Sequence, residues 1–184
     1  MIAHNSPYDM RTIDQILQEL IPPADHSHRN GFSNEHLILE LTKEERVHVE
    51  LRLIEMLKKT DDVLIGETLT ILKSRSSLPG LRNRLALARS SFSKIIWASF
   101  INELEEGDEH LKEIVRSEFE KINDKYVLTS AFYYLRSFND PAINDKIRSY
   151  INDADYLTAY NARQCLGIDT QKIIDRERAK GKDR

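Results

Sequence analysis

AFYYLRSFNDPAINDKIRSYINDADYLTAYNARQCLGI, residues 131–168, is the stretch that decides the fold of this 184-residue chain. An apolar run with helical spacing ends at Asn139-Asp140-Pro141, and two further runs follow, separated near Asp155. Proline fits the first turn of a helix, and an aspartate just before it accepts hydrogen bonds from free N–H groups. Asp140-Pro141 therefore marks a helix start, and the stretch predicts helices joined by short turns. The same reasoning predicts helix N-caps along the chain at Asp62, Ser77, Ser93, Asp108, Asp140, Asp155 and Asp169.

The same pattern recurs upstream at a nearly fixed period. Four segments align: VLIGETLTIL (63–72), IIWASFINEL (95–104), YVLTSAFYYL (126–135) and LTAYNARQCL (157–166). Their closing residues are 32, 31 and 31 positions apart, at Leu72, Leu104, Leu135 and Leu166. Positions seven, four and three before each leucine share one helical face, and they are small or apolar except for Arg163. The four first helices therefore share one buried face.

A second helix follows each of these first helices. The second helices carry the apolar stripes Leu78, Leu81 and Leu85; Leu111, Ile114, Val115 and Phe119; Ile143, Ile147 and Ile151; and Ile173 with Ile174. Helix pairs of fixed period cannot bury their faces alone and stack on their neighbours. The sequence therefore predicts an all-α chain built as a short α-solenoid.

Residues 131–168 resemble HEAT-like repeats. The resemblance lies in the Asp-Pro break between paired helices and in a small-residue helix that ends in Leu or Leu-Gly, and it extends over roughly residues 61–178. The repeats are shorter than the usual length of about 40 residues, and the Val-Arg pair of HEAT helices is missing. The resemblance implies a right-handed α-solenoid of HEAT-like helix pairs, a concave groove lined by the second helices, and a binding role. An unrelated helical bundle is the alternative fold.

The N-terminal part differs in character from the repeats. Residues 10–20 have helical spacing, and a polar, proline- and histidine-containing loop follows at 22–34. Thr42-Lys43-Glu44-Glu45 has the spacing of a capping box and opens a long helix whose predicted stripe is Val47, Leu51, Ile54 and Met56 or Leu57. We expect one compact domain overall, with residues 1–41 as a helical cap and loop, 42–178 as HEAT-like repeats and 179–184 as a frayed tail. A packed cap would bury Ile13, Leu17, Leu20, Phe32, Leu37, Ile38 and Leu41.

Charge is segregated along the repeats, although the whole chain carries only −3. No acidic residue lies between Glu67 and Glu103, and that interval holds six cations: Lys73, Arg75, Arg82, Arg84, Arg89 and Lys94. Residues 103–124 hold nine acidic and three basic side chains, a net charge of −6. The basic run has two interpretations. It binds an acidic surface or a phosphate backbone of a partner, or it is neutralised within the chain by the acidic helix beside it. Aromatic residues are not regularly interleaved with these cations, as they are in proteins that bind single strands.

Other side chains have both a structural and a functional interpretation. Tyr133 and Tyr134 are candidate interface anchors because tyrosine is enriched at binding hot spots, although exposed tyrosines are common. Trp97 occupies a repeat position and is expected in the core, and Cys165 is expected to be a buried small hydrophobe. His26 and His28 lie in the 22–34 loop beside Asp25 and could hold a metal, but their spacing matches no metal motif, and loop histidines are usually just solvated.

Several function classes find no support in the sequence. Gly-rich phosphate loops, HExxH, CxxC and GxSxG are all missing, so we expect no enzyme activity, catalytic residue, metal or cofactor. No apolar run reaches membrane length, and the first residues, MIAHNSPYDMRTIDQ, lack the apolar core of a signal peptide. We therefore expect a cytoplasmic protein with no membrane partner and no small-molecule substrate.

The sequence favours a non-catalytic protein–protein interaction module that binds one dedicated macromolecular partner, as an adaptor or a toxin-neutralising immunity-type protein. The candidate contacts are Lys73, Arg75, Arg82, Arg84, Arg89, Lys94, Tyr133 and Tyr134. The alternative is a nucleic-acid-binding HEAT-like protein that uses the basic 73–94 face. HEAT-like DNA glycosylases use Trp and Asp in a basic groove, but no Asp lies near Trp97 in this run.

Overall fold

A computed structural model describes residues 11–105 and 107–182. Every regular element in these ranges is helical and no strand occurs there, so the prediction of an all-α chain is confirmed. The chain divides into two compact units, Met1–Ser77 and Leu78–Arg184. This division differs from the single domain with a boundary at 41/42 that we expected from the sequence. The residues before that boundary belong to the first unit because α1 and α3 pack on α4 and α5.

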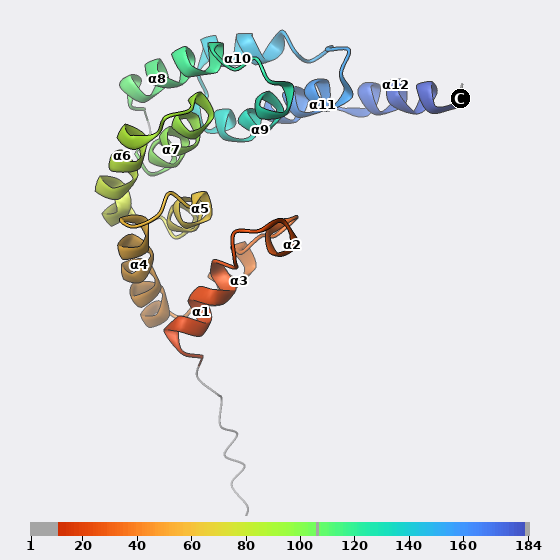
Figure 1. Ribbon diagram of the computed structural model, residues 1–184. Helices are drawn as coiled ribbons and strands as arrows, with labels where there is room; N and C mark the ends of the chain where they lie inside the picture. Colours follow the sequence, from red (N-terminus) through yellow and green to blue (C-terminus); the bar gives the residue numbers. More distant parts are fainter. Residues whose placement is uncertain (1–10, 106, 183–184) are drawn as a thin grey trace, which may run out of the picture. The chain divides into compact units, whose positions relative to one another are not determined.

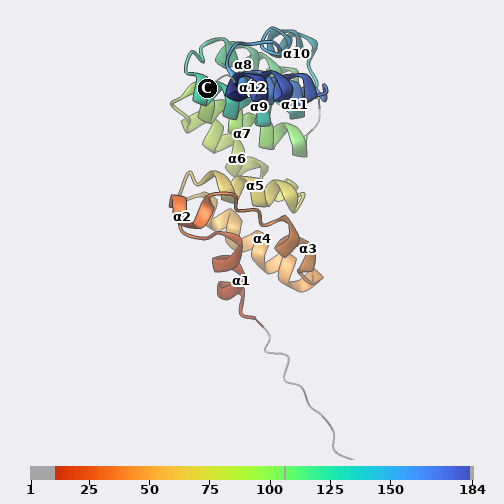
Figure 2. The same cartoon turned by 90° about the vertical axis from the view of Figure 1, so that its right-hand side faces the viewer.

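The first unit is built around one long helix. Its elements are α1 (Ile13–Leu20), α2 (His26–Arg29), α3 (Glu35–Glu40), α4 (Lys43–Leu57), α5 (Val63–Ile71) and η1 (Arg75–Ser77). Figures 1 and 2 show α1 and α3 on the same side of α4, and α5 packs against both α3 and α4. The core of this unit therefore lies on one side of α4.

The buried stripe of α4 is not the predicted one. Val49, Leu53 and Leu57 are buried, whereas Val47 and Leu51 are 55% and 58% exposed. Leu57, one of the two predicted alternatives at the end of the stripe, is buried, but the prediction was wrong for Val47 and Leu51. The reason is that α4 is apolar on two faces, and the neighbouring helices cover only one of them. The apolar residues of the expected cap do contribute to the core: Leu17, Leu20, Ile38 and Leu41 are buried, and Ile13, Phe32 and Leu37 are half-buried.

Residues 22–34 are tied to the start of α5. The Arg29 guanidinium donates to both carboxylate oxygens of Asp62 at 2.6 and 2.7 Å and to the Pro22 carbonyl. Asp62 is also the N-cap of α5, as predicted, and accepts from the Leu64 N–H. The Asn34 amide donates to the Thr68 hydroxyl at 2.7 Å. This segment is therefore part of the first unit's framework.

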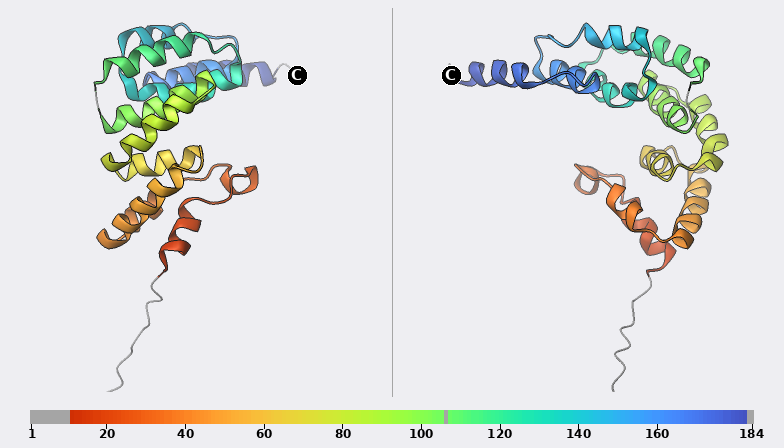
Figure 3. Two further views of the ribbon diagram at one scale, coloured as in Figure 1. Left: turned by 60° about the vertical axis from the view of Figure 1, so that its left-hand side comes forward. Right: turned by 180° about the vertical axis from the view of Figure 1, so that it is seen from behind.

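The second unit places its helices in two layers. Its elements are α6 (Leu78–Leu87), α7 (Ser91–Leu104), α8 (Glu109–Glu120), α9 (Lys125–Leu135), η2 (Arg136–Phe138), α10 (Pro141–Arg148), α11 (Tyr156–Cys165) and α12 (Gln171–Lys182). In Figures 1 and 3, α8 and α10 form one layer, and α7, α9 and α11 form the other. α7 packs against α6, α8 and α9, and α11 packs against α9, α10 and α12.

The aligned positions of the four first helices are buried as predicted. Seven residues before each closing leucine, the buried residues are Ile65, Trp97, Leu128 and Ala159. Four residues before it they are Thr68, Phe100, Ala131 and Ala162, and three residues before it they are Leu69, Ile101, Phe132 and Arg163. The closing residues Leu104 and Leu135 are buried, and Leu72 and Leu166 are half-buried. The repeated face is therefore a core face in both units.

Arg163 interrupts the apolar pattern for a structural reason. Its side chain is 8% exposed and donates to the Ile151 carbonyl at 2.8 Å, the Asp169 carbonyl at 2.7 Å and the Asn152 amide oxygen at 3.0 Å. A buried cation is tolerated when its donors find acceptors. Arg163 thus connects the turn after α10 to the segment before α12.

Most of the predicted helix starts are correct. Asp108, Asp140 and Asp155 each accept N–H hydrogen bonds at the starts of α8, α10 and α11. Two predicted caps were wrong. Ser90, not Ser93, caps α7, and the Ser77 hydroxyl donates to the Ser74 carbonyl instead of accepting. Serine-rich stretches offer several equivalent caps, so their spacing does not decide between them.

Candidate functional site

A groove of about 600 Å³ lies between α6 and α8 in the second unit. Its apolar lining comes from Leu85 and Ala86 on α6 and from Leu111 and Ile114 on α8. Leu111 is buried, Leu85 and Ile114 are half-buried, and Ala86 is exposed. The groove therefore offers apolar surface from two helices to a ligand.

Ion pairs fasten the helices around this groove at two places. In the middle of α6, Arg82 pairs with Glu105 at the end of α7 and with Asp108 at the start of α8. At the start of α7, the Lys94 ammonium lies 2.7 Å from a carboxylate oxygen of Glu118 near the end of α8. These pairings place the end of α7 beside the start of α8 and the start of α7 beside the end of α8, so α7 and α8 run antiparallel. Both walls of the groove are thus connected to α7 by ion pairs.

Glu118 is the most strongly held charge at the groove. Its buried carboxylate accepts from Lys94 at 2.7 Å, from the Ser91 hydroxyl at 2.7 Å and from Lys121 at 3.0 Å. The Lys94 hydrogen bond is the main cause that lowers the pKa of Glu118 to about 2, against the opposing effect of burial. Glu118 is therefore ionised at neutral pH, and it links the start of α7 to α8.

Two of the six cations of the basic run line the groove. Arg82 and Lys94 do so, and both already have carboxylate partners within the second unit. Arg84 is half-buried and Arg89 is exposed. The hydrogen bond that Arg82 donates to Glu105 raises the pKa of Arg82 further above its ordinary value. Part of the positive charge is thus neutralised by acidic residues of 103–124. This agrees with the interpretation that the basic run is neutralised by the acidic helix beside it.

The remaining two cations belong to the first unit. Lys73 and Arg75 are exposed there, next to the end of α5. Lys73 adopts a left-handed backbone conformation, with φ of 58°, as residues that follow a helix end often do. Its backbone therefore has a clear local role, which is to terminate α5.

The two candidate tyrosines have different surroundings. Tyr134 is half-buried and makes edge-on ring contacts with Phe92 and Phe100 at 5.9 and 6.0 Å between ring centroids. Tyr133 is 58% exposed, and the Arg136 guanidinium carbon lies 5.7 Å from its ring centroid. Tyr133 also lines a second, smaller pocket of about 230 Å³ between α9 and α11 with Phe132, Arg136, Tyr160, Asn161, Gln164 and Cys165. Tyr133 is therefore the better placed of the two for contact with a ligand.

Cys165 is half-buried, whereas the sequence led us to expect a buried residue. Burial raises the pKa of its thiol to about 11. The thiolate is the nucleophilic form of cysteine, so this thiol is unreactive at neutral pH. Trp97 is 2% exposed and packs edge-on against Phe100, which confirms its expected place in the core.

The histidine-containing segment forms a local network. The Asp25 carboxylate accepts from the Ser27 hydroxyl at 2.6 Å, and His28 Nδ1 lies 2.8 Å from it. These hydrogen bonds, from Ser27 first and then His28, hold the pKa of Asp25 far below its ordinary value. The side chain of His26 lies outside the described residues. Within the described residues, no three His, Cys, Asp or Glu side chains are arranged to hold a metal ion.

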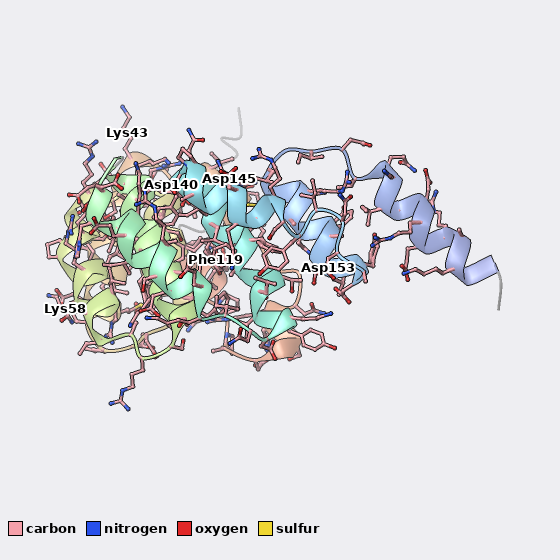
Figure 4. All side chains as sticks on the ribbon, turned by 90° about the horizontal axis from the view of Figure 1, so that it is seen from above. Lys43, Lys58, Phe119, Asp140, Asp145 and Asp153 are labelled. Carbon is pink, nitrogen blue, oxygen red and sulfur yellow. The ribbon has the colours of Figure 1, made fainter. Side chains whose placement is uncertain are left out.

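The sequence did not predict that Leu85 and Ile114 line a groove. Both belong to apolar stripes that were expected in the core, yet only Leu78 and Leu81 on α6 and Leu111, Val115 and Phe119 on α8 are buried. Figure 4 shows Phe119 among the helices of the second unit. On α8, Leu111, Val115 and Phe119 follow each other at intervals of four, and Ile114 lies beside that stripe. Such an offset apolar residue is the signal that marks the groove wall.

None of the helices in the described ranges combines the length and the apolar character needed to cross a membrane. Comparison of the chain with protein families, with curated proteins and with solved structures finds no match.

Proposed function

We propose that this chain is a non-catalytic protein-binding module, and that the groove between α6 and α8 receives an amphipathic helix from one dedicated protein partner. The observation that carries the proposal is the apolar lining of the groove by two helices, with Leu85 and Ile114 only half-buried. A groove of this kind suits a helix that presents apolar residues on one face.

The ion pairs around the groove support binding by a preorganised surface. Arg82 is held by Glu105 and Asp108, and Lys94 is held by Glu118, before any partner arrives. A surface whose side chains are already ordered loses less entropy on binding. The same apolar contacts therefore give a higher net affinity than they would on a surface whose side chains must first be ordered.

The charges at the rim favour one orientation of the partner helix. Arg82 and Lys94 come from α6 and α7, whereas Glu113 and Glu118 come from α8. Because Lys94 and Glu118 already neutralise each other, the distinguishing charges are Arg82 on α6 and Glu113 on α8. A partner helix with an acidic residue facing Arg82 and a basic residue facing Glu113 fits in one direction only. Electrostatic complementarity of this kind raises specificity and the association rate more than affinity.

We further propose that the two-layered arrangement is a short right-handed HEAT-like solenoid. The 31-residue spacing, the burial at the aligned positions and the groove between two second helices, α6 and α8, support it. The proposal includes a cytoplasmic location and an adaptor or immunity-type role. It assigns no enzyme activity, cofactor, metal, membrane partner or small-molecule substrate.

Nucleic-acid binding through the basic 73–94 face is the second candidate. The excess of cations in that run favours it. Two of these cations, Arg82 and Lys94, already have carboxylate partners, and the groove beside them is apolar. Binding to duplex DNA that falls steeply with salt, and that is lost in the combined variant Arg82→Glu/Arg84→Glu/Arg89→Glu, would favour this candidate over a protein partner.

A matched pair of variants tests the groove. Helical peptides are selected from a displayed library against the folded chain, and their dissociation constants are measured with Ala86→Glu and Leu87→Glu. Both substitutions add the same charge at exposed, adjacent positions of α6, but only Ala86 lines the groove. We expect Ala86→Glu to weaken binding about tenfold or more, since it places a charge in an apolar contact, and Leu87→Glu to leave binding unchanged.

Ile114→Ala provides a test from the opposite wall without adding a charge. It should weaken the same peptides because it removes apolar contact area. Circular dichroism confirms that each variant is folded. Equal affinities for Ala86→Glu, Leu87→Glu and the unmodified chain would refute the groove as the binding site.

A further inference from the structure

The long helix of the first unit has an apolar face that no other helix of that unit covers. Val47 and Leu51 on α4 are 55% and 58% exposed, and Ile54 is half-buried. They lie opposite the buried stripe of Val49 and Leu53, and Figure 1 shows α1, α3 and α5 on the other side of α4. Large apolar side chains that recur on one exposed helix face typically mark an interaction surface.

This face is symmetric in sequence about its centre. The positions that share it by helical spacing are Glu44, Val47, His48, Leu51, Ile54, Glu55 and Lys58. Counted outwards from Leu51, they lie three, four and seven residues away in both directions. The N-terminal end of the face carries an acid, Glu44, and the C-terminal end carries a base, Lys58.

We propose that this α4 face docks on the same face of a second copy of this chain, with the two helices antiparallel about a two-fold axis at Leu51. A two-fold interface uses one patch twice, so the patch must be complementary to itself. In this arrangement Leu51 meets Leu51 of the second copy, and Val47 lies beside Ile54. Glu44 meets Lys58 at both ends, so that two opposite-charge pairs frame an apolar centre.

The charges in the single chain leave these contacts open. Lys58 pairs with Glu55 on its own helix, but both side chains are well exposed, at 60% and 59%, and such pairs contribute little to stability. Figure 4 shows Lys58 and Lys43 projecting outwards. Lys58 is therefore accessible to an incoming carboxylate.

The small size of the face determines how tightly it binds. One helix face with three large apolar side chains buries less than the roughly 1,000 Å² of a stable interface. We therefore expect a reversible dimer with a dissociation constant on the order of tens of micromolar. This association uses the first unit alone, so it neither requires nor excludes binding in the groove of the second unit.

Sedimentation velocity of the full chain from about 1 to about 500 µM tests the proposal. We expect the sedimentation coefficient to rise with concentration, and Leu51→Glu to weaken association at least tenfold because it places two like charges at the axis. Leu39→Glu is the matched control, since Leu39 is 70% exposed on α3 and lies off this face. A chain that stays monomeric throughout, or an equal loss with Leu39→Glu, overturns the proposal.

Charge reversal tests the antiparallel pairing. Glu44→Lys and Lys58→Glu each place like charges opposite one another and should weaken the dimer severalfold. The combined variant restores opposite charges at both ends and should recover the affinity of the unmodified chain. Additive weakening in the combined variant would overturn the antiparallel arrangement.

Discussion

Helices α7 and α4 are similar in length but differ in how much of their surface the fold uses. Every residue of α7 from Ile95 to Asn102 is buried, because α6, α8, α9 and η2 pack around it. α4 buries Val49, Leu53 and Leu57 on one face and exposes Val47 and Leu51 on the other. An apolar face is thus a core face only where a neighbouring helix covers it. The uncovered face of α4 is the one we assign to a second copy.

The largest effect in this comparison is expected in α7. Phe100→Ala should lower the free energy of unfolding of the second unit by about 3–5 kcal/mol, because it leaves a cavity among packed aromatic rings. Phe100 is 3% exposed and contacts Trp97 and Tyr134. Urea denaturation followed by tryptophan fluorescence measures this loss in the free energy of unfolding, since Trp97 is the only tryptophan of the chain. A loss below 1 kcal/mol would show that α7 is not the centre of that unit.

The two faces of α4 are compared by one pair of substitutions. Leu53→Ala should cost about 2–5 kcal/mol because Leu53 is fully buried. Leu51→Ala should change stability by less than about 0.5 kcal/mol in dilute solution. Urea denaturation at low protein concentration, followed by circular dichroism, measures both. Equal costs would mean that the exposed face is packed in solution.

A smaller effect is expected at the start of α10. Asp140 is 2% exposed, caps α10 and accepts from Arg116 of α8 at 3.1 Å. Asp140→Asn keeps a capping side chain but removes the charge, so it should cost about 1–3 kcal/mol. Asp145→Asn is the control, because Asp145 pairs with Arg148 on an exposed surface. It should cost less than about 0.5 kcal/mol, and equal costs in thermal denaturation would refute a special role for Asp140.

A further effect is a change in the pH dependence of stability. The Lys94 hydrogen bond lowers the pKa of Glu118 to about 2 from its ordinary 4.5. A carboxylate whose pKa is lower in the folded chain stabilises the fold above its unfolded pKa, and this stability is lost as the pH falls towards the folded value. Glu118→Gln should therefore flatten the fall in stability between about pH 4.5 and about pH 2. An unchanged slope in urea titrations across this window would contradict the assignment.

The sequence predicted the helical class, the burial of the aligned positions in the first helices and most aspartate caps, because these depend on local spacing. It did not predict which face of α4 is buried, since both faces satisfy helical periodicity and only tertiary contacts distinguish them. The partners of Arg82 and Lys94 also required the structure, because charge segregation is equally consistent with binding and with internal pairing. Arg163 was recognised as a break in the pattern, but its three acceptors lie in segments whose positions the spacing does not determine.

The most direct test of the account is methyl NMR of the isotope-labelled chain titrated with a helical peptide selected against it. We predict the largest chemical-shift changes at Leu85, Leu111 and Ile114 in the α6–α8 groove, with the α4 methyl groups of Val47 and Leu51 unchanged at concentrations where the chain is monomeric. Shifts centred on α4 or on the surroundings of Tyr133, with the groove methyl groups unaffected, would contradict the assignment of the groove as the partner-binding site.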